Sequence, residues 1–273
     1  MRKKLFVVVF CAVFVAVISA GSALAIFTNG GFEQNDFSGW TTGYGQNYGL
    51  SGAQPFTEAS IVIQPGGTEL LSIAGVGASD PITDNLLQLP REGSFTATVN
   101  DASDDYHLNW ISQQGTITQA DRDPNDNQLH VRFRYAAVLE DAGHSPNEQP
   151  FFHVIVKNVS NATTLFDDFT VADEIGKPFV ASVSNPGWLW MDWQSVDIVI
   201  PDSDLNDTLE IRVTAADCAQ GGHGGYVYLD GFGSAPPPPQ GSTVVPTMTE
   251  WGMIIFVVLA GLVSVYYMRK QRV

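Results

Sequence analysis

The chain contains few cysteines and few basic residues. Only two cysteines and 13 lysine and arginine residues occur among its 273 residues, against 29 aspartate and glutamate residues. Six of the basic residues lie at the extreme ends, so residues 26–250 hold 7 basic and 29 acidic residues, a balance of −22. A surface this acidic repels phosphate backbones. We therefore expect no nucleic-acid partner.

Long helical patterns are also missing from residues 26–235, where turn formers and short apolar stretches alternate instead. The whole chain has 26 Gly and 15 Pro, and 44% of its residues are hydrophobic. The clearest strand patterns are residues 131–135, 151–156, 196–198, 209–213 and 226–230. Strands without helices between them favour antiparallel pairing. The pattern predicts an all-β fold, an antiparallel β-sandwich or jelly roll, in one domain at 26–235.

The amino-terminal segment has the three parts of a secretory signal. Basic residues at 2–4 precede an apolar run at 5–18 and a group of small residues at 22–25. This order predicts a signal peptide at 1–25 that is removed on export, with an uncleaved anchor as the alternative. The exported chain then keeps one cysteine, Cys218, and can form no internal disulfide.

The carboxyl-terminal segment has the order of a membrane anchor. A proline-rich linker at 236–245 predicts an extended spacer. An apolar stretch at 253–268 predicts a transmembrane helix, and the basic tail at 269–273 is expected to stay in the cytoplasm by the positive-inside rule. The preceding domain would then lie outside the membrane.

A short motif at 246–252, together with the residue before it, links the spacer to this apolar stretch. The residues that match a known pattern are Val245, Pro246, Thr247, Met248, Trp251 and Gly252. They resemble the IPTL-type sorting signal (IPTL-CTERM) of Gram-negative bacteria, with valine in place of the isoleucine and methionine in place of the leucine. The resemblance implies an exosortase-type protease as a partner. It also implies that the protein is exported to the cell envelope or the cell surface, where it is either kept or released after cleavage. The alternative is a permanent anchor with a tryptophan at the membrane interface.

The domain itself resembles galactose-binding-like jelly rolls, which include many carbohydrate-binding modules. The resemblance lies in the sequences NGGFE at 29–33, FSGW at 37–40 and the stretch at 217–230. It implies that the first and last strands lie side by side.

The same resemblance implies a structural calcium ion at that junction. Its carboxylate ligands would be Glu33 and Asp230, and backbone carbonyls near Asn29 and Gly31 would complete the shell. Calcium favours six to eight hard oxygen ligands, so the chemistry is consistent. The alternative is that both acids are ordinary residues at strand ends.

Tryptophans are the candidates for carbohydrate binding, because sugars stack on flat aromatic rings. Trp188 and Trp190 are two residues apart, so in a strand they would point to the same face. Trp110 is the third candidate. The alternative is that these rings belong to the core of the sandwich.

Three further patterns have mainly structural interpretations. Residues 121–127 imitate the start of an EF-hand loop but lack its glycine and its final glutamate, which favours a polar turn. His223 lies between two glycine pairs, and we expect a hydrogen bond to Asp217 or contact with the loop at His144. Cys218 is expected to be a small buried residue.

Three functions are compatible with the sequence. The first is a non-catalytic surface or matrix protein that binds carbohydrate or another envelope component through a calcium-stabilised jelly roll. The second is a structural or adhesive coat protein without a small ligand. The third, a secreted glycan-active enzyme, is disfavoured because no motif indicates paired catalytic carboxylates or a nucleophile with its base.

Overall fold

The computed structural model describes residues 26–233. The predicted signal peptide, linker, sorting motif, transmembrane helix and basic tail lie outside these residues, as do the last two residues of the predicted domain. Within the described part, the only helices are three short 3-10 turns, at Glu58–Ser60, Gln119–Asp121 and Asp202–Asp204. No helix there is long and apolar enough to span a bilayer.

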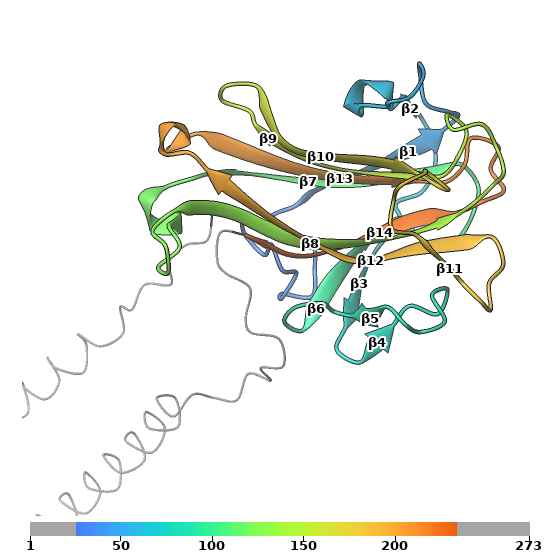
Figure 1. The fold of residues 1–273 in the computed structure, drawn as a ribbon, viewed down its shortest axis with the longest axis horizontal. Coiled ribbons are helices and arrows are strands. Elements are labelled where there is room, and N and C mark those ends of the chain that lie inside the picture. Colours follow the sequence, from blue (N-terminus) through green and yellow to red (C-terminus); the bar gives the residue numbers. More distant parts are fainter. Residues whose placement is uncertain (1–25, 234–273) are drawn as a thin grey trace, which may run out of the picture. The chain divides into compact units, whose positions relative to one another are not determined.

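Two six-stranded antiparallel sheets lie face to face (Figure 1). The first has the order β10-β9-β13-β7-β1-β2 and the second β11-β12-β8-β14-β6-β3. The strands of the first sheet are β1 (Thr41–Asn47), β2 (Ile63–Gln64), β7 (His107–Thr116), β9 (Phe151–Asn158), β10 (Thr163–Val171) and β13 (Thr208–Ala216). Those of the second are β3 (Leu71–Gly75), β6 (Phe95–Val99), β8 (Leu129–Glu140), β11 (Val180–Ala181), β12 (Trp188–Ile200) and β14 (Gly225–Gly233). A small third sheet pairs β4 (Ala78–Ser79) with β5 (Gln88–Leu89).

The connectivity of the main strands is that of a jelly roll. Along the chain β6, β8, β12 and β14 belong to the second sheet, and β7, β9, β10 and β13 to the first. Their spatial orders, β6-β14-β8-β12 and β7-β13-β9-β10, are those of two interlocked Greek keys. The predicted antiparallel sandwich is confirmed, and each of the five predicted strand patterns lies within a strand.

The core lies between the two sheets and follows from alternation along the strands. In β13, Leu209, Ile211 and Val213 are fully buried in the main hydrophobic cluster, whereas Glu210 and Arg212 point away from it. In β8, Val131 and Phe133 enter the same cluster. Because successive residues of a strand face opposite sides, this period of two places one apolar row of each sheet in the core.

A segment between β3 and β6 folds back over the outer face of the second sheet. Leu87 and Leu89 from this segment form a second buried cluster with Val138 and Tyr226. Its Asp80 is fully buried and accepts hydrogen bonds from the hydroxyls of Tyr226 (2.7 Å) and Tyr228 (2.8 Å). The carboxylate and the two hydroxyls therefore join this segment to β14.

The amino-terminal segment reaches the last strand, but β1 does not. Gly30 accepts a backbone hydrogen bond from Phe232 in β14 at 3.0 Å, whereas β1 lies in the opposite sheet. The implied pairing of first and last strands is therefore wrong. Residues 26–40 form turns, with Asn29, Phe32 and Asn35 at positive φ, and such a backbone cannot pair as a regular strand.

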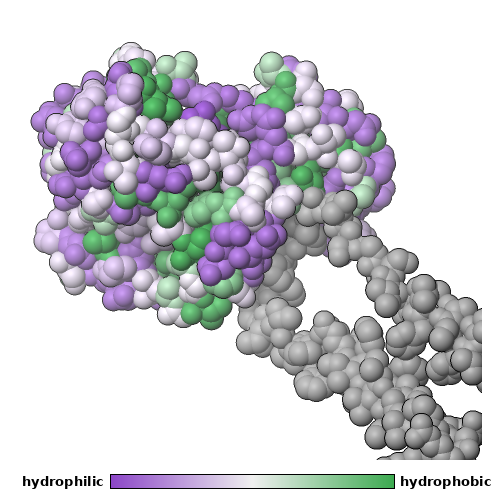
Figure 2. Space-filling model, turned by 180° about the vertical axis from the view of Figure 1, so that it is seen from behind, coloured by the Kyte–Doolittle hydropathy of each residue, from purple (hydrophilic) through white to green (hydrophobic). Residues whose placement is uncertain are grey.

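Figure 2 shows one face of the molecule, on which hydrophobic residues form small patches among hydrophilic ones. Scattered apolar residues of this kind are usual on the surface of a folded domain.

Candidate binding and metal sites

The two acids proposed as calcium ligands lie on either side of the segment at 91–95. Asp230, on β14, accepts hydrogen bonds through Oδ2 from the backbone N–H groups of Arg91 (2.8 Å) and Glu92 (2.9 Å). Glu33, in the amino-terminal turn, accepts one through Oε1 from the N–H of Ser94 at 2.8 Å. Both carboxylates therefore hold the same segment in place.

The other carboxylate oxygen of Asp230 could accept a further hydrogen bond or bind a cation. Its Oδ1 is buried and has no hydrogen-bond partner among the described residues. Burial, together with the nearby charge of Glu92, raises the pKa of Asp230 to about 8, against the opposing effect of backbone hydrogen bonds. A cation at Oδ1 would supply the missing partner and stabilise the ionised carboxylate. This one buried oxygen suits a hard cation, and calcium binding at the junction stays a prediction.

Glu92 is a third acid at this junction, and the sequence reasoning missed it. Its pKa is raised, mainly by burial, although Arg134 lies 3.3 Å away and opposes the rise. It packs so close to Gly231 that a Cβ there would lie 2.5 Å from Oε2. Neither sequence spacing nor a motif connects Glu92 to Glu33 or Asp230, so only the fold brings them together.

The proposed carbonyl ligands are placed less favourably. The carbonyl oxygen of Asn29 already accepts hydrogen bonds from the backbone of Phe32 (3.0 Å) and from Nε1 of Trp40 (3.1 Å). Gly31 lies close to the residue after Asp230, because a Cβ on it would lie 4.0 Å from the Cα of Gly231. A ligand role for either carbonyl stays a prediction.

Trp188 and Trp190 share a face, as expected, but that face is covered. Trp190 belongs to the second hydrophobic cluster, beneath the segment between β3 and β6, and Trp188 is partly buried against this cluster. Trp190 is only 7% exposed. The ring of Trp188 lies 6.1 Å from that of Tyr226. Trp190 therefore presents no open ring to a ligand in this structure, and a binding role for the pair stays a prediction.

Trp110 lies on the outer face of the first sheet and is half-buried. Its ring rests on Gly43 of β1, where a Cβ would come within 2.3 Å of it, so only glycine fits opposite. The guanidinium of Arg212 lies 4.3 Å from the ring centroid, within the range of a cation–π contact. The ring is thus held in a packed stack, and its role in binding also stays a prediction.

A pocket of about 570 Å³ opens near one end of the first sheet. Its aromatic lining comes from Phe56, in the segment before β2, and from Phe169 on β10, whose ring centroids are 5.9 Å apart. The ring of Phe169 stacks on the ring of Phe151, with the two ring centroids 5.2 Å apart. Gln54 and Asp173 are among its polar lining residues.

The EF-hand-like stretch forms a hydrogen-bonded turn, as expected. Asp123 accepts from the backbone N–H of Asn125 at 2.8 Å, and its other oxygen lies 2.8 Å from Nη2 of Arg132. Asp126 pairs with Nε2 of His130 at 3.1 Å. Asp123, Asp126 and His130 are close enough together to hold an ion, but these internal contacts already use their oxygens and ring nitrogen.

No protein-family model matches the chain, and no curated protein matches it. Among solved structures, a carbohydrate-binding module of the β-sandwich superfamily is similar, with 11% identity and a TM-score of 0.34. The match covers 78% of this chain and 62% of that one, so the chain spans less than two thirds of its length.

Two further structures are similar. The carbohydrate-binding module CBM27-1 of Caldicellulosiruptor saccharolyticus, solved with mannohexaose, has 13% identity and a TM-score of 0.33, with 61% of this chain and 82% of that one covered. A cyclase from Fischerella sp. TAU has 16% identity and a TM-score of 0.36, with 77% and 96% covered. These similarities concern the β-sandwich architecture alone.

Proposed function

We propose that the chain is a non-catalytic envelope protein that binds carbohydrate in the pocket lined by Phe56 and Phe169. The observation that carries the proposal is the combination of aromatic and polar groups in that pocket. Sugars offer apolar faces that pack on aromatic rings and hydroxyls that need hydrogen-bond partners. The pocket supplies the rings from two different segments, and Gln54 and Asp173 supply amide and carboxylate groups.

Its size supports the same ligand class. A volume of about 570 Å³ lies within the range of small-molecule sites and would hold one or two sugar rings. The supporting contacts of Phe169 with Phe151 and with His153, whose ring centroid is 4.9 Å away, keep this ring in place before a ligand arrives. Such preorganisation lowers the entropic cost of binding.

Export, sorting and calcium binding complete the proposal. The signal-peptide pattern at 1–25 and the motif at 245–252 support export to the envelope of a Gram-negative bacterium and handling by an exosortase-type protease, either as an anchored or as a released protein. The support for calcium is Oδ1 of Asp230, which has no partner in the described part of the chain and lies beside the segment that Glu33 also holds.

A glycan array probed with the full chain, purified in detergent, tests the proposal. We expect selective retention of one glycan class, with the bound glycan recovered intact. Retention of none would favour the structural or adhesive coat protein. Recovery of cleaved glycan would favour the glycan-active enzyme.

A further inference from the structure

Two loops meet at one end of the sandwich, and each carries side chains that bind transition metals. The first, residues 141–150, joins β8 to β9, and the second, residues 217–224, joins β13 to β14. A backbone hydrogen bond from Ala219 to the carbonyl of Glu148 (2.9 Å) ties the loops together, and one from Glu140 to the carbonyl of Gly224 (3.0 Å) ties the second loop to the end of β8. Their relative position is therefore set by the fold.

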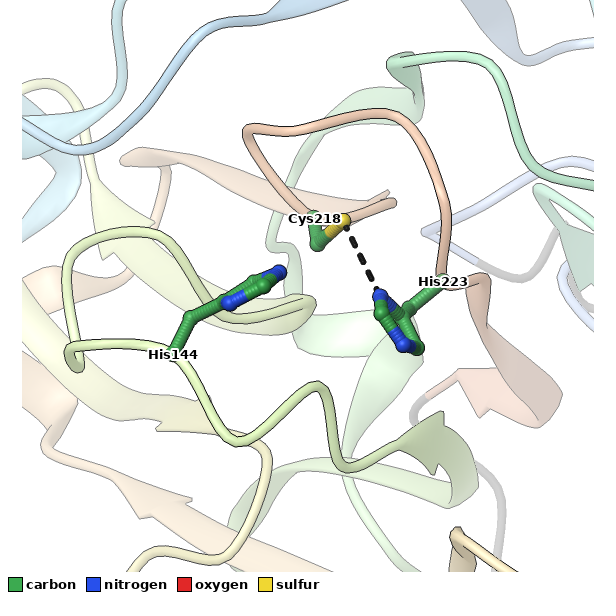
Figure 3. A group of neighbouring side chains, drawn as sticks. All are labelled: His144, Cys218 and His223. Atoms are coloured by element: carbon green, nitrogen blue, oxygen red, sulfur yellow. Dashed lines mark hydrogen bonds between the residues drawn. The ribbon is translucent and has the colours of Figure 1, made fainter.

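His144, from the first loop, faces Cys218 and His223, from the second (Figure 3). One ligand atom from each of the three lies within 4.8 Å of the other two. Sγ of Cys218 is 3.6 Å from Nδ1 of His223. In a tetrahedral zinc site with Zn–S of about 2.3 Å and Zn–N of about 2.1 Å, this edge measures about 3.6 Å.

The local backbone brings Cys218 and His223 together and leaves them ready to bind. The N–H of Cys218 donates to the carbonyl of His223 at 2.9 Å, and Gly221 closes the turn at positive φ, where glycine is favoured. The N–H of Gly222 donates to Sγ at 3.4 Å, a contact that stabilises a thiolate.

The burial of these side chains is a second, independent indication of a metal site. Cys218 is fully buried, and Nε2 of His144 is buried without a hydrogen-bond partner among the described residues. An imidazole nitrogen in this state lacks the partner that buried polar atoms nearly always have. A metal ion is a partner that the cluster can accept.

We propose that His144, Cys218 and His223 bind a transition-metal ion, with Zn²⁺ as the expected ion. Two imidazoles and a thiolate suit a borderline-soft ion, whereas calcium requires oxygen ligands, so this site is distinct from the one at Asp230. Binding releases the thiol proton to solvent. His144 also lines the 570 Å³ pocket, so an ion would reach the cluster from that side and water would take the fourth coordination position.

A cobalt titration of the full chain, purified in detergent, tests this site, because Co²⁺ bound to a thiolate gives a charge-transfer absorption that other ligands do not. We expect one equivalent of Co²⁺ to produce this band and Zn²⁺ to displace it. Cys218→Ser should abolish the band, and His144→Ala should weaken binding by about tenfold or more. His107→Gln is the matched control, since it changes a histidine outside the cluster, and it should bind like wild type.

Absence of the band in the wild-type chain would overturn the proposal. So would a His144→Ala variant that binds Co²⁺ as tightly as wild type. If Cys218→Ser fails to fold, His144→Ala decides, because this half-buried loop side chain can be removed without opening the core. The result does not depend on glycan binding, so this proposal and the proposed function can fail separately.

Discussion

Glu33 and Asp230 come from opposite ends of the domain and hold the same segment of chain, residues 91–95, through its backbone N–H groups. Asp230 keeps one buried oxygen that has no partner within residues 26–233. The junction of the amino-terminal turn and the last strand is thus built around carboxylates, and a cation bound there would stabilise it.

Calcium should stabilise the domain through this junction. At a concentration about 100-fold above its Kd, calcium should raise the melting midpoint of residues 26–235 by about 5–10 °C relative to chelator. Asp230→Asn should remove most of this gain, because the amide carries no charge. Glu33→Gln should reduce it. The measurement is a thermal melt followed by circular dichroism.

The matched control for these variants is Glu69→Gln, which removes an exposed acid outside the junction and should keep the full calcium effect. Equal midpoints of the wild-type domain in calcium and in chelator would show that no such ion binds there.

Asp80 should be important for stability. Asp80→Ala removes the acceptor of two buried tyrosine hydroxyls and should lower the free energy of unfolding by about 3 kcal/mol or more. Tyr228→Phe deletes only one of these hydrogen bonds, so we expect about 1–1.5 kcal/mol. Urea unfolding of residues 26–235 measures both values. A smaller loss for Asp80→Ala than for Tyr228→Phe would contradict this role.

Much of the jelly roll could be predicted from the sequence, because alternation within the strands reports the two faces of a sheet directly. Residues 209–213 alternate apolar with charged and do form a two-faced strand. The position of the segment between β3 and β6 could not be predicted. This segment covers Trp190 only because it folds back over the second sheet and because its Asp80 binds β14. The candidate binding pocket was missed for the same reason, because Phe56 and Phe169 meet only in the folded chain.

Motifs in the sequence pointed to individual residues but not to their neighbours in the folded chain. The motif resemblance pointed to Glu33 and Asp230, which the fold places beside one segment. It could not indicate Glu92, whose position depends on the turn after β5. The contact of His223 with the loop at His144 was one of two expectations and is confirmed, with ring centroids 5.3 Å apart. The other, a bond to Asp217, does not form, because Asp217 binds Asn100 and the backbone of His107 instead.

Stability should depend on pH through His153. Burial lowers the pKa of His153 below its ordinary value, against the opposing effect of Asp167. The unfolded chain therefore takes up this proton at a higher pH than the folded domain does. This contribution to stability is complete above a pH of about 6.5 and is lost as the pH falls below it.

We expect the free energy of unfolding to fall less steeply with acidification in His153→Gln than in wild type. Urea unfolding between pH values of about 7 and 5 measures the difference. Parallel curves for the two proteins would assign the acid sensitivity to other groups.

The backbone around Gly30 is packed too closely to leave room for a side chain at this position. A Cβ on Gly30 would lie 1.8 Å from the carbonyl oxygen of Phe232. Gly30→Ala should therefore cost about 3 kcal/mol or more in urea unfolding. Gly222→Ala, with open space around its Cβ, should change stability by about 0.5 kcal/mol at most. Equal losses for the two variants would contradict the contact between the amino-terminal turn and β14.

The affinity of the full chain for the glycan class retained on the array is the most direct measure of the proposed function. Isothermal titration should give an affinity that Phe56→Ala lowers by about tenfold or more, because an aromatic face in the pocket is lost. Tyr44→Ala, which removes an aromatic residue that is 51% exposed on β1 and does not line the pocket, should leave it unchanged. Equal affinities for Phe56→Ala and wild type would contradict carbohydrate binding in this pocket.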